Sequence, residues 1–379
     1  MNKKKPNFQL IQEGTTKLYA CPSKQSVKGP GIKDNEPFYN PAMELNRDLS
    51  VVVSQWFVNR SKKQVHIVDG LAASGIRGVR IAHEVTGDFM VAINDWDDDS
   101  FSLIKKNIAH NKLTNAVASK KNLNVLLSEN KYQMIDIDPF GSPVYFVDSA
   151  CRSITNNGVL SCTATDTAAL CGVYPLVCLR RYGAQPAHSY YMHEIGLRIL
   201  LGFLAREMAK YDKGIQPLVS YSTDHYFRVY VQIRNGKQNA DESMQHVRLF
   251  DATDPIVSDG KNNNSRPIGP LWMGNLHKKT AVQELRTLLF EKQVNTKHAL
   301  WKLLQLFEDE ADAPPFFFTM EDIASRLKIG APPMKTLFRK LQEHKYIAVR
   351  THFSATGFKT NAPSHELEKI FKTITMKKQ

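Results

Sequence analysis

The sequence predicts an α/β fold in which helices cover both faces of a parallel sheet, followed by a region of different texture. Short apolar runs alternate with helical patterns between residues 65 and 162, which is typical of a parallel sheet. Beyond about residue 190, strong amphipathic helices and a long β-branched and aromatic stretch take over. A chain of 379 residues is long for one compact core. We therefore expect two domains, residues 1–190 and 191–379.

The first region begins with an amphipathic helix and continues with alternating strands and helices. Apolar side chains recur at helical spacing over residues 43–58. The expected strands are 65–68, 89–93, 134–137 and 158–162, and the expected helices are 76–84, 100–110 and 144–154. Ligands of such sheets bind at the carboxyl ends of the strands, so the segments that follow each strand are the candidate site.

The second region reads as an α+β domain. We expect a helix over 194–210, a strand or strand pair over 218–233, a polar loop over 235–267, and helices near 280–292 and 295–308. Residues 309–315 resemble a linker. The order helix, turn, helix, strand that follows predicts a winged-helix-like element over about 316–379.

Charge and cysteine content restrict the class of protein. Fifty Lys and Arg against thirty-seven Asp and Glu give a net charge of +13, which favours a polyanionic partner, although solvated lysines alone can produce such an excess. The five cysteines form no C-x-x-C pair, so we predict neither a zinc site nor a redox dithiol. We expect the protein to lie in a reducing cytoplasm. No apolar run is long enough to span a bilayer, and the N-terminus lacks the apolar segment of a signal peptide.

A turn rich in small residues, 69–78, joins the first predicted strand to its helix and suggests a cofactor site. It begins with Asp69 and contains Gly75. Small residues let the backbone approach a ligand, and the helix N-terminus favours negative charge. The spacing matches neither the dinucleotide fingerprint nor a P-loop. Asp95 follows the second strand, where an acid can accept hydrogen bonds from ribose hydroxyls. A plain tight turn and a helix-capping acid remain the alternatives.

The segment Asp138-Pro139-Phe140 follows a buried strand and suggests the reaction. An exocyclic base amine is a poor nucleophile, and its nitrogen becomes cationic as it takes up an alkyl group. An acceptor such as Asp138 held against the N–H therefore helps most in the transition state. The Pro139 carbonyl offers a second acceptor, and Phe140 offers a stacking face for an extruded base. A turn whose Asp caps the next helix is the alternative.

Together these segments resemble the tRNA (guanine-26-N2) dimethyltransferase family. The matching stretches run in order along nearly the whole chain, which is far more specific than any single motif. They are Phe38–Pro41 with Leu45–Asp48, Ser74–Gly78, Asp136–Pro143, Thr163–Ala168, Tyr221–Val229, Gly269–Trp272, and Arg350–Phe353 with Lys359–Ala362.

The resemblance implies a class I (Rossmann-like) methyltransferase domain that uses S-adenosyl-L-methionine, followed by a family-specific tRNA-binding domain. The expected reaction is one or two methyl transfers to N2 of a tRNA guanine, made directly and without a covalent enzyme intermediate. Arg47 and Arg77 would lie near the methionine carboxylate and Asp95 on the ribose. Asp138 would hold the guanine amine, with Phe38 and Phe140 stacking on the base.

Three positions depart from the family pattern. Asn122-Leu123 stands where members usually have Asp-Ala, and Asn122 can still accept a hydrogen bond from adenine through its amide oxygen. Ala42 stands where Arg is common after Asn-Pro. Many members carry a zinc-binding cysteine cluster in the C-terminal half, whereas residues 235–267 contain no cysteine. We therefore predict no metal.

Basic residues interspersed with aromatics in the winged-helix-like part are the candidate RNA contacts, namely Lys335, Arg339, Lys340, Arg350 and Lys359. Solvated helix faces are the simpler interpretation for each one singly. Two other functions remain open: a DNA amino-methyltransferase, which uses a similar Asp-Pro-aromatic turn, and a non-catalytic RNA-binding protein built on a degenerate methyltransferase domain. The sequence says little about oligomeric state, and we expect a monomer without membrane association.

Overall fold

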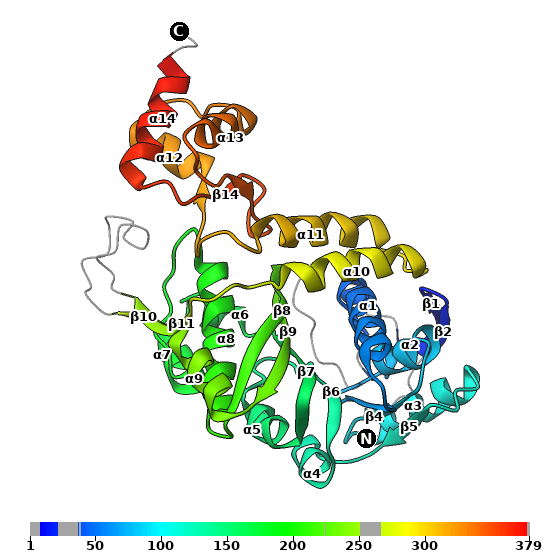
Figure 1. Cartoon of the computed structure of the whole chain (residues 1–379). Helices are drawn as coiled ribbons and strands as arrows, with labels where there is room; N and C mark the ends of the chain where they lie inside the picture. The colour runs from blue at the N-terminus through cyan, green and yellow to red at the C-terminus, as the bar shows by residue number, and fades with distance from the viewer. Residues whose placement is uncertain (1–7, 22–36, 38, 224, 251–266, 377–379) are drawn as a thin grey trace, which may run out of the picture.

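The computed structural model of the chain describes residues 8–21, 37, 39–223, 225–250 and 267–376. A seven-stranded sheet in the order β5-β4-β3-β6-β7-β9-β8 forms its centre (Figure 1). Strands β3 to β7 run parallel, and β9 is antiparallel to both β7 and β8. The strands are β3 (Val65–Asp69), β4 (Phe89–Asn94), β5 (Ala116–Ser119), β6 (Tyr132–Ile137), β7 (Ile154–Ala164), β8 (Lys213–Thr223) and β9 (Tyr226–Asn235).

Helices cover both faces of this sheet because its strands are apolar on both sides. Ile135 and Ile137 of β6 pack into one buried cluster, whereas Met134 packs into the other, as the two-residue period of a strand requires. Helices α1 (Glu44–Arg60), α2 (Ile76–Glu84) and α3 (Asp98–His110) lie on the Met134 side, and α4 (Leu123–Glu129), α5 (Val144–Ser153) and α8 (Met192–Ala209) on the opposite side.

The predicted α/β core is confirmed, and the sheet is mixed rather than purely parallel. The stretch predicted as a strand or strand pair over 218–233 is the hairpin β8–β9, which completes the sheet. The sheet therefore continues past residue 190. The predicted loop over 235–267 is wrong in its first part, which forms α9 (Lys237–Gln245) and β10 (Val247–Phe250). Helix α9 is short and polar, so its apolar periodicity is weak.

Smaller elements decorate this core. The hairpin of β1 (Gln9–Glu13) and β2 (Thr16–Ala20) packs on α2 and α3. A 3₁₀ turn, η1 (Pro41–Met43), leads into α1. Helices α6 (Thr167–Leu170) and α7 (Pro175–Tyr182) connect β7 to α8, and β11 (Ile268–Trp272) pairs with β10. The helical pair α10 (Lys279–Glu291) and α11 (Lys297–Glu310) packs against α1.

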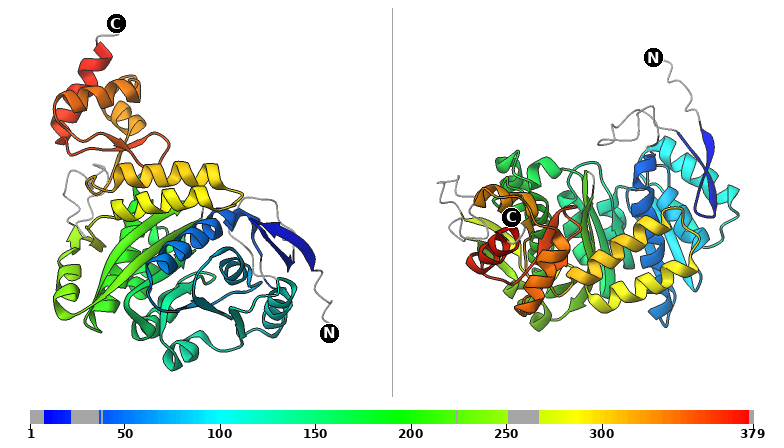
Figure 2. Two further views of the ribbon diagram at one scale, coloured as in Figure 1. Left: turned by 45° about the vertical axis from the view of Figure 1, so that its right-hand side comes forward. Right: turned by 90° about the horizontal axis from the view of Figure 1, so that it is seen from above.

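The last part of the chain forms a compact C-terminal unit that stands on the end of α11, away from the sheet (Figures 1 and 2). Its three strands are ordered β12-β14-β13, and Phe318, Leu337 and Phe358 belong to its own buried core. Its elements are β12 (Phe318–Thr319), α12 (Met320–Leu327), α13 (Met334–Glu343), β13 (Val349–Arg350), β14 (Gly357–Lys359) and α14 (Ser364–Met376). Of the helices described anywhere in the chain, none is long and apolar enough to cross a membrane.

Candidate active site

The loop between β3 and α2 is held by two of the predicted acids. Gly75, at the N-cap of α2, has φ 76°, a left-handed conformation that favours glycine. Asp69 is buried and accepts a hydrogen bond from the Gly78 amide at 2.8 Å. Asp95, at the end of β4, accepts one from the Ala73 amide at 2.7 Å. Both carboxylates therefore fix the backbone of the loop.

Burial raises the pKa of Asp69 to about 7, with a further contribution from Asp136, against the opposing effect of Arg77. The residues after β5 complete this edge. Asn122 is exposed and caps α4 through its side-chain oxygen, which accepts from the Asn124 amide at 2.9 Å. Leu123 is buried beneath the loop, where a Cβ on Gly70 would lie 2.8 Å from a Leu123 methyl group.

Arg77 of α2 is the centre of the polar side chains at this edge. Its Nη1 donates to Asn46 Oδ1 at 2.6 Å and to Ser50 Oγ at 2.5 Å, both on α1. Its Nη2 donates to Asp138, and its Nε lies 3.5 Å from Asp136 Oδ1. A guanidinium held by four side chains has little freedom to rotate, so Arg77 is oriented before any ligand arrives.

Beneath Arg77, Asp136 of β6 forms a buried ion pair with Arg228 of β9. Arg228 Nη1 donates to Asp136 Oδ1 at 3.2 Å and to Thr163 Oγ1 at 2.8 Å. Burial alone would raise the pKa of Asp136, but Arg228 and Arg77 outweigh it and hold that pKa below its ordinary value. The sequence analysis did not single out this pair. Arg228 lies within the apolar run of β9, and this charged residue in an apolar strand could have indicated a buried ion pair.

The loop after β6 presents the predicted reaction segment. Asp138 is partly exposed, Pro139 is buried, and the Phe140 side chain is 46% exposed. Gly141 has φ 88°, and its carbonyl accepts from the Thr165 amide at 2.9 Å. The loop is therefore fixed to the end of β7, with Asp138 turned toward Arg77. Phe38, the other predicted stacking residue, lies outside the described residues.

Arg47, the second arginine predicted to lie near the methionine carboxylate, is already paired. Its guanidinium makes two hydrogen bonds to Glu13, at 2.8 Å and 2.5 Å, and a third to the Asn40 carbonyl at 3.0 Å. The Tyr39 ring lies 5.4 Å away. Arg47 thus contacts Glu13 and Asn40, whereas Arg77 contacts Asp138.

Comparison with known proteins decides the family of this chain. The family model described as N2,N2-dimethylguanosine tRNA methyltransferase matches residues 20–372. The chain belongs to this family.

Relatives at similar length agree with this assignment. The tRNA (guanine(26)-N(2))-dimethyltransferase of Methanobrevibacter smithii is 35% identical over 97% of this chain and 98% of its own, and that of Pyrococcus abyssi is 38% identical over 93% and 96%. The structure of Trm1 from Pyrococcus horikoshii with S-adenosyl-L-methionine has a TM-score of 0.84 and 34% identity, over 97% of this chain and 100% of that one. The chain is an S-adenosylmethionine-dependent methyltransferase that acts on guanine N2 in tRNA.

The family's cofactor fits the side chains present. Asn46 accepts from Arg77 through its side-chain oxygen, but its Nδ2 is buried without a hydrogen-bond partner. Ser74 Oγ, in the β3–α2 loop, is also buried without one. An unpaired buried donor is costly unless a ligand completes it. A guanidinium with such a donor beside it suits a carboxylate, and Asp95 suits ribose hydroxyls.

Four of the five predicted RNA contacts lie on the surface of the C-terminal unit or near it. Lys335 and Arg339 are exposed on α13. Lys340 is half-buried and pairs with Glu343 at 2.5 Å. Arg350 is exposed and donates to the Ala355 carbonyl at 2.9 Å.

The prediction that Lys359 contacts RNA is wrong for this structure. Its side chain is 2% exposed, and Nζ lies 2.7 Å from Glu194 Oε1 on α8. The same oxygen accepts from Arg198 at 2.8 Å and from the Phe316 amide at 2.8 Å. Lys359 lies on β14, the central strand of the small sheet, and anchors the C-terminal unit to the catalytic core.

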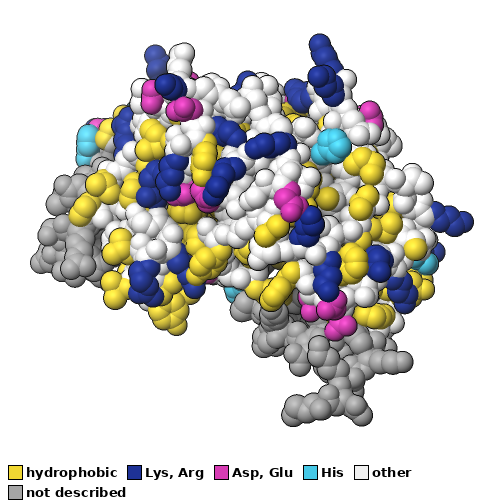
Figure 3. All heavy atoms as spheres, turned by 90° about the horizontal axis from the view of Figure 1, so that it is seen from below, with side chains coloured by type: hydrophobic (Ala, Val, Ile, Leu, Met, Phe, Trp, Pro, Cys, Tyr) yellow, Lys and Arg dark blue, Asp and Glu magenta, His cyan; other side chains and the backbone are white. Residues whose placement is uncertain are grey.

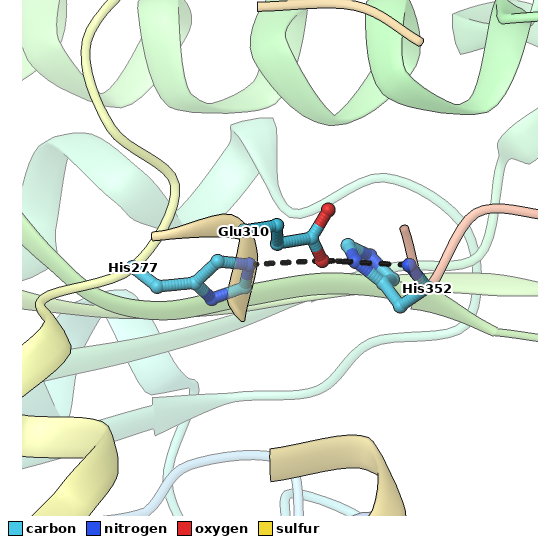
Figure 4. Close-up of side chains that lie close together, drawn as sticks. All are labelled: His277, Glu310 and His352. Atoms are coloured by element: carbon cyan, nitrogen blue, oxygen red, sulfur yellow. Dashed lines mark hydrogen bonds and ion pairs between the residues drawn. The ribbon is translucent and has the colours of Figure 1, made fainter. Parts of the chain in front are cut away.

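A second buried cluster contains residue types that also bind metals, namely His277, Glu310 and His352 (Figure 4). Glu310 Oε1 lies between the two rings, 3.5 Å from His277 Nε2 and bonded to His352 Nδ1. The opposite ring nitrogens face the Ser220 amide at 3.5 Å and the Ser222 amide at 3.4 Å.

These contacts favour a hydrogen-bonded cluster over a metal centre. Backbone N–H groups of β8 point at His277 Nδ1 and His352 Nε2, so those nitrogens act as acceptors and the ring protons face Glu310. A metal would need the opposite tautomers, with N–H facing N–H. Burial lowers the pKa of His277 to about 4 against the opposing effect of Glu310. His277 is therefore neutral at pH 7.

Proposed function

We propose that this chain transfers one or two methyl groups from S-adenosylmethionine to N2 of guanine 26 in tRNA, with Asp138 holding the amine. The observation that carries the proposal is the placement of Asp138. It follows β6 beside the half-exposed Phe140 ring and next to Arg77, which belongs to the cofactor loop. Base, acceptor and methyl donor would therefore meet at one edge of the sheet.

Asp138 acts on the guanine amine. The lone pair of N2 is delocalised into the ring, and charge develops on nitrogen as the new C–N bond forms. The carboxylate accepts a hydrogen bond from the amine, stabilises that charge and takes up a proton. The Pro139 carbonyl is the second acceptor, while Phe140 and Phe38 stack on the extruded base.

The cofactor would supply an electrophilic methyl group, whose bond to sulfur would break as the C–N bond forms and leave a neutral thioether. Arg77, with Asn46 beside it, binds its carboxylate, Asp95 accepts from the ribose, and Asn122 accepts from the adenine amine. Arg47 contributes through the Glu13 pair that fixes the start of α1. Asp69, Gly75 and Leu123 keep the loop in the shape that admits the cofactor.

Transfer is direct, because the cysteines lack the properties of nucleophiles. Cys21, Cys151, Cys162, Cys171 and Cys178 are all buried thiols. Burial raises the pKa of Cys151, Cys171 and Cys178 to about 12, so the thiolate population at neutral pH is negligible.

The C-terminal part binds tRNA. Its helix, helix and strand order, with a three-stranded sheet, supports a winged-helix assignment for residues 316–379. Lys335, Arg339, Lys340 and Arg350 contact phosphates. Figure 3 shows the opposite side of the molecule, away from the C-terminal unit, where Lys and Arg side chains are also widely spread, so the basic surface that suits a polyanion is not confined to that unit.

The decisive experiment is methyl transfer from labelled cofactor to an unmodified tRNA transcript, with the product nucleoside mapped. Wild type is expected to yield N2-methylated guanosine at position 26. Asp138→Ala should lower the rate by about 100-fold or more while still binding the cofactor in calorimetry. Methylation of duplex DNA in place of tRNA would refute the proposed substrate, and cofactor binding without any transfer would indicate a non-catalytic protein.

We also propose a cytoplasmic monomer without a resident metal. The hydrogen-bonding pattern of His277, Glu310 and His352 supports the last point. Elemental analysis of the purified protein should find less than stoichiometric zinc, and light scattering should give the mass of one chain. A metal that remains bound after dialysis, at one per chain, would contradict the assignment.

A further inference from the structure

Exposed apolar side chains are concentrated around the proposed reaction site. Among the described residues, seven of the fourteen large hydrophobic side chains that are exposed follow the carboxyl ends of β4, β6 and β7. They include Trp96, Phe140 and Tyr145, and four more lie between residues 173 and 179. A monomer rarely exposes a large group of apolar side chains without a ligand for it. The Asp138 loop alone does not explain why the apolar side chains of residues 173–179 are exposed.

Helix α7 divides these side chains between two faces. Cys178 and Tyr182 are fully buried against the core. Leu176 is 65% exposed and Leu179 48% exposed, and Arg180 is exposed one position further along. Residues three and four apart lie side by side on a helix, so the outer face presents two leucines and a guanidinium. Tyr174, which precedes the helix, is 59% exposed. We call Tyr174, Leu176, Leu179 and Arg180 the α7 ridge.

The buried face of α7 is bonded directly to the loops of the reaction site. The Tyr182 hydroxyl donates to Asp166 at 2.7 Å and accepts from Ser142 at 2.9 Å. Arg181 pairs with the same Asp166 at 2.9 Å. Ser142 is two residues from Phe140, and Asp166 follows the Thr165 that fixes Gly141. The ridge is therefore held rigidly beside the Asp138 loop.

We propose that the α7 ridge binds the nucleotides next to the target guanine, which lose their stacking partner when that base is extruded. The inference rests on the proposed function. Extrusion exposes the apolar faces of neighbouring bases, and proteins that open a helix often insert leucine or an aromatic ring there. Tyr174 supplies a stacking face, Leu176 and Leu179 cover the neighbouring base and ribose, and Arg180 meets a phosphate.

Charge favours RNA over a protein partner on this surface. Arg180 and Arg181 follow the two leucines on α7, and Asp166, the carboxylate bonded to this helix, is paired with Arg181. The chain as a whole carries +13. An exposed arginine beside apolar side chains, next to a site that acts on a tRNA base, matches a single-stranded nucleic acid.

The test compares Leu176→Ala/Leu179→Ala and Arg180→Ala with wild type, and uses Phe290→Ala as the control. Phe290 on α10 is 66% exposed, so its loss removes a similar apolar surface far from α7. Each α7 variant should raise the Kd for tRNA about tenfold, as expected for loss of one base contact, with an unchanged Kd for S-adenosylmethionine. Phe290→Ala should leave both unchanged.

A second readout reports on unstacking itself. With 2-aminopurine beside the target guanine, binding of wild type should change its fluorescence, and Leu176→Ala/Leu179→Ala should abolish that change. If the α7 variants bind tRNA like Phe290→Ala, the inference is wrong. It is also wrong if the double variant retains tRNA binding but loses self-association seen for wild type in light scattering. Absence of tRNA methylation by wild type would instead reject the proposed function.

Discussion

Arg228 is a single side chain that supports the position of Asp138 through Asp136 and Arg77. It is fully buried and holds Asp136, whose other neighbour is Arg77. Arg77 in turn contacts Asp138. The partly exposed reaction residue is thus supported by an alternating row of carboxylates and guanidinium groups that ends in the sheet interior, where geometry is held most firmly.

Replacing Arg228 should reveal the size of this support. Arg228→Met leaves the buried Asp136 with Arg77 alone, and we expect a loss of about 3–5 kcal/mol in unfolding free energy, measured by urea denaturation. Arg228→Lys keeps the charge but loses the paired hydrogen bonds, so it should lose less. A methionine variant as stable as wild type would show that the charge pair contributes nothing net.

Cys162 on β7 pairs with Ile137, the last residue of β6, which directly precedes Asp138. Burial raises the pKa of its thiol far above the ordinary value. Cys162→Ala should therefore leave the single-turnover rate of methyl transfer within about twofold of wild type, because a buried neutral thiol does not attack carbon. Loss of the chemical step in a variant that still folds and binds tRNA would contradict direct transfer.

Single residues differed in how far the sequence could place them. Asp95 and Asp138 were accessible to prediction because each follows an apolar strand, and parallel strands end at a common edge. The pairing of Asp136 with Arg228 joins positions 92 apart, which no local pattern contains. Lys359 was misassigned because a lysine usually lies in solvent, and only the fold brings Glu194 to it.

At the scale of elements, periodicity located the strands and long helices of the core but not its edges. The hairpin β8–β9 was visible as a β-branched and aromatic run, yet its place at the end of the sheet depends on pairing with β7. The cap on the outer edge of β8 comes from His277 and from His352. His277 lies between β11 and α10, and His352 lies in the C-terminal unit beyond α11, so neither residue is close to β8 in the sequence.

This cap predicts acid sensitivity of the fold. His277 has a folded pKa of about 4 against 6.5 for the free side chain, so the unfolded chain binds the proton more readily. The stabilisation is fully present above pH 6.5 and is lost as pH falls toward 4, by about 3 kcal/mol for this one group. Glu310, His352 and Lys359 interact with the same ring and also affect how stability depends on pH.

His277→Asn is the variant that tests this origin. Asparagine can accept from the Ser220 amide without titrating, so the fall in stability between pH 6.5 and 4 should become shallower in urea denaturation. His298→Asn, at an exposed histidine, is the matched control and should follow wild type. An unchanged pH profile in His277→Asn would place the acid sensitivity elsewhere.

For the whole molecule, the charge of +13 predicts that tRNA affinity falls steeply with salt. Lys335 and Arg339 are exposed on α13, and each phosphate contact adds about one to the slope of log affinity against log salt. Lys335→Ala/Arg339→Ala should therefore reduce the slope by about two. Lys62→Ala, on the loop after α1, should leave it unchanged, and equal slopes for all three proteins would remove the C-terminal unit from the interface.

The histidine cap has one more consequence, which concerns solubility. An uncovered strand edge is a template for pairing with another chain. Here His352, from the C-terminal unit, covers the Ser222 amide of β8, the last strand of the large sheet. A chain cut within residues 311–315 would keep its catalytic core but expose that edge, and it should precipitate or form fibrils at concentrations where the full chain stays in solution.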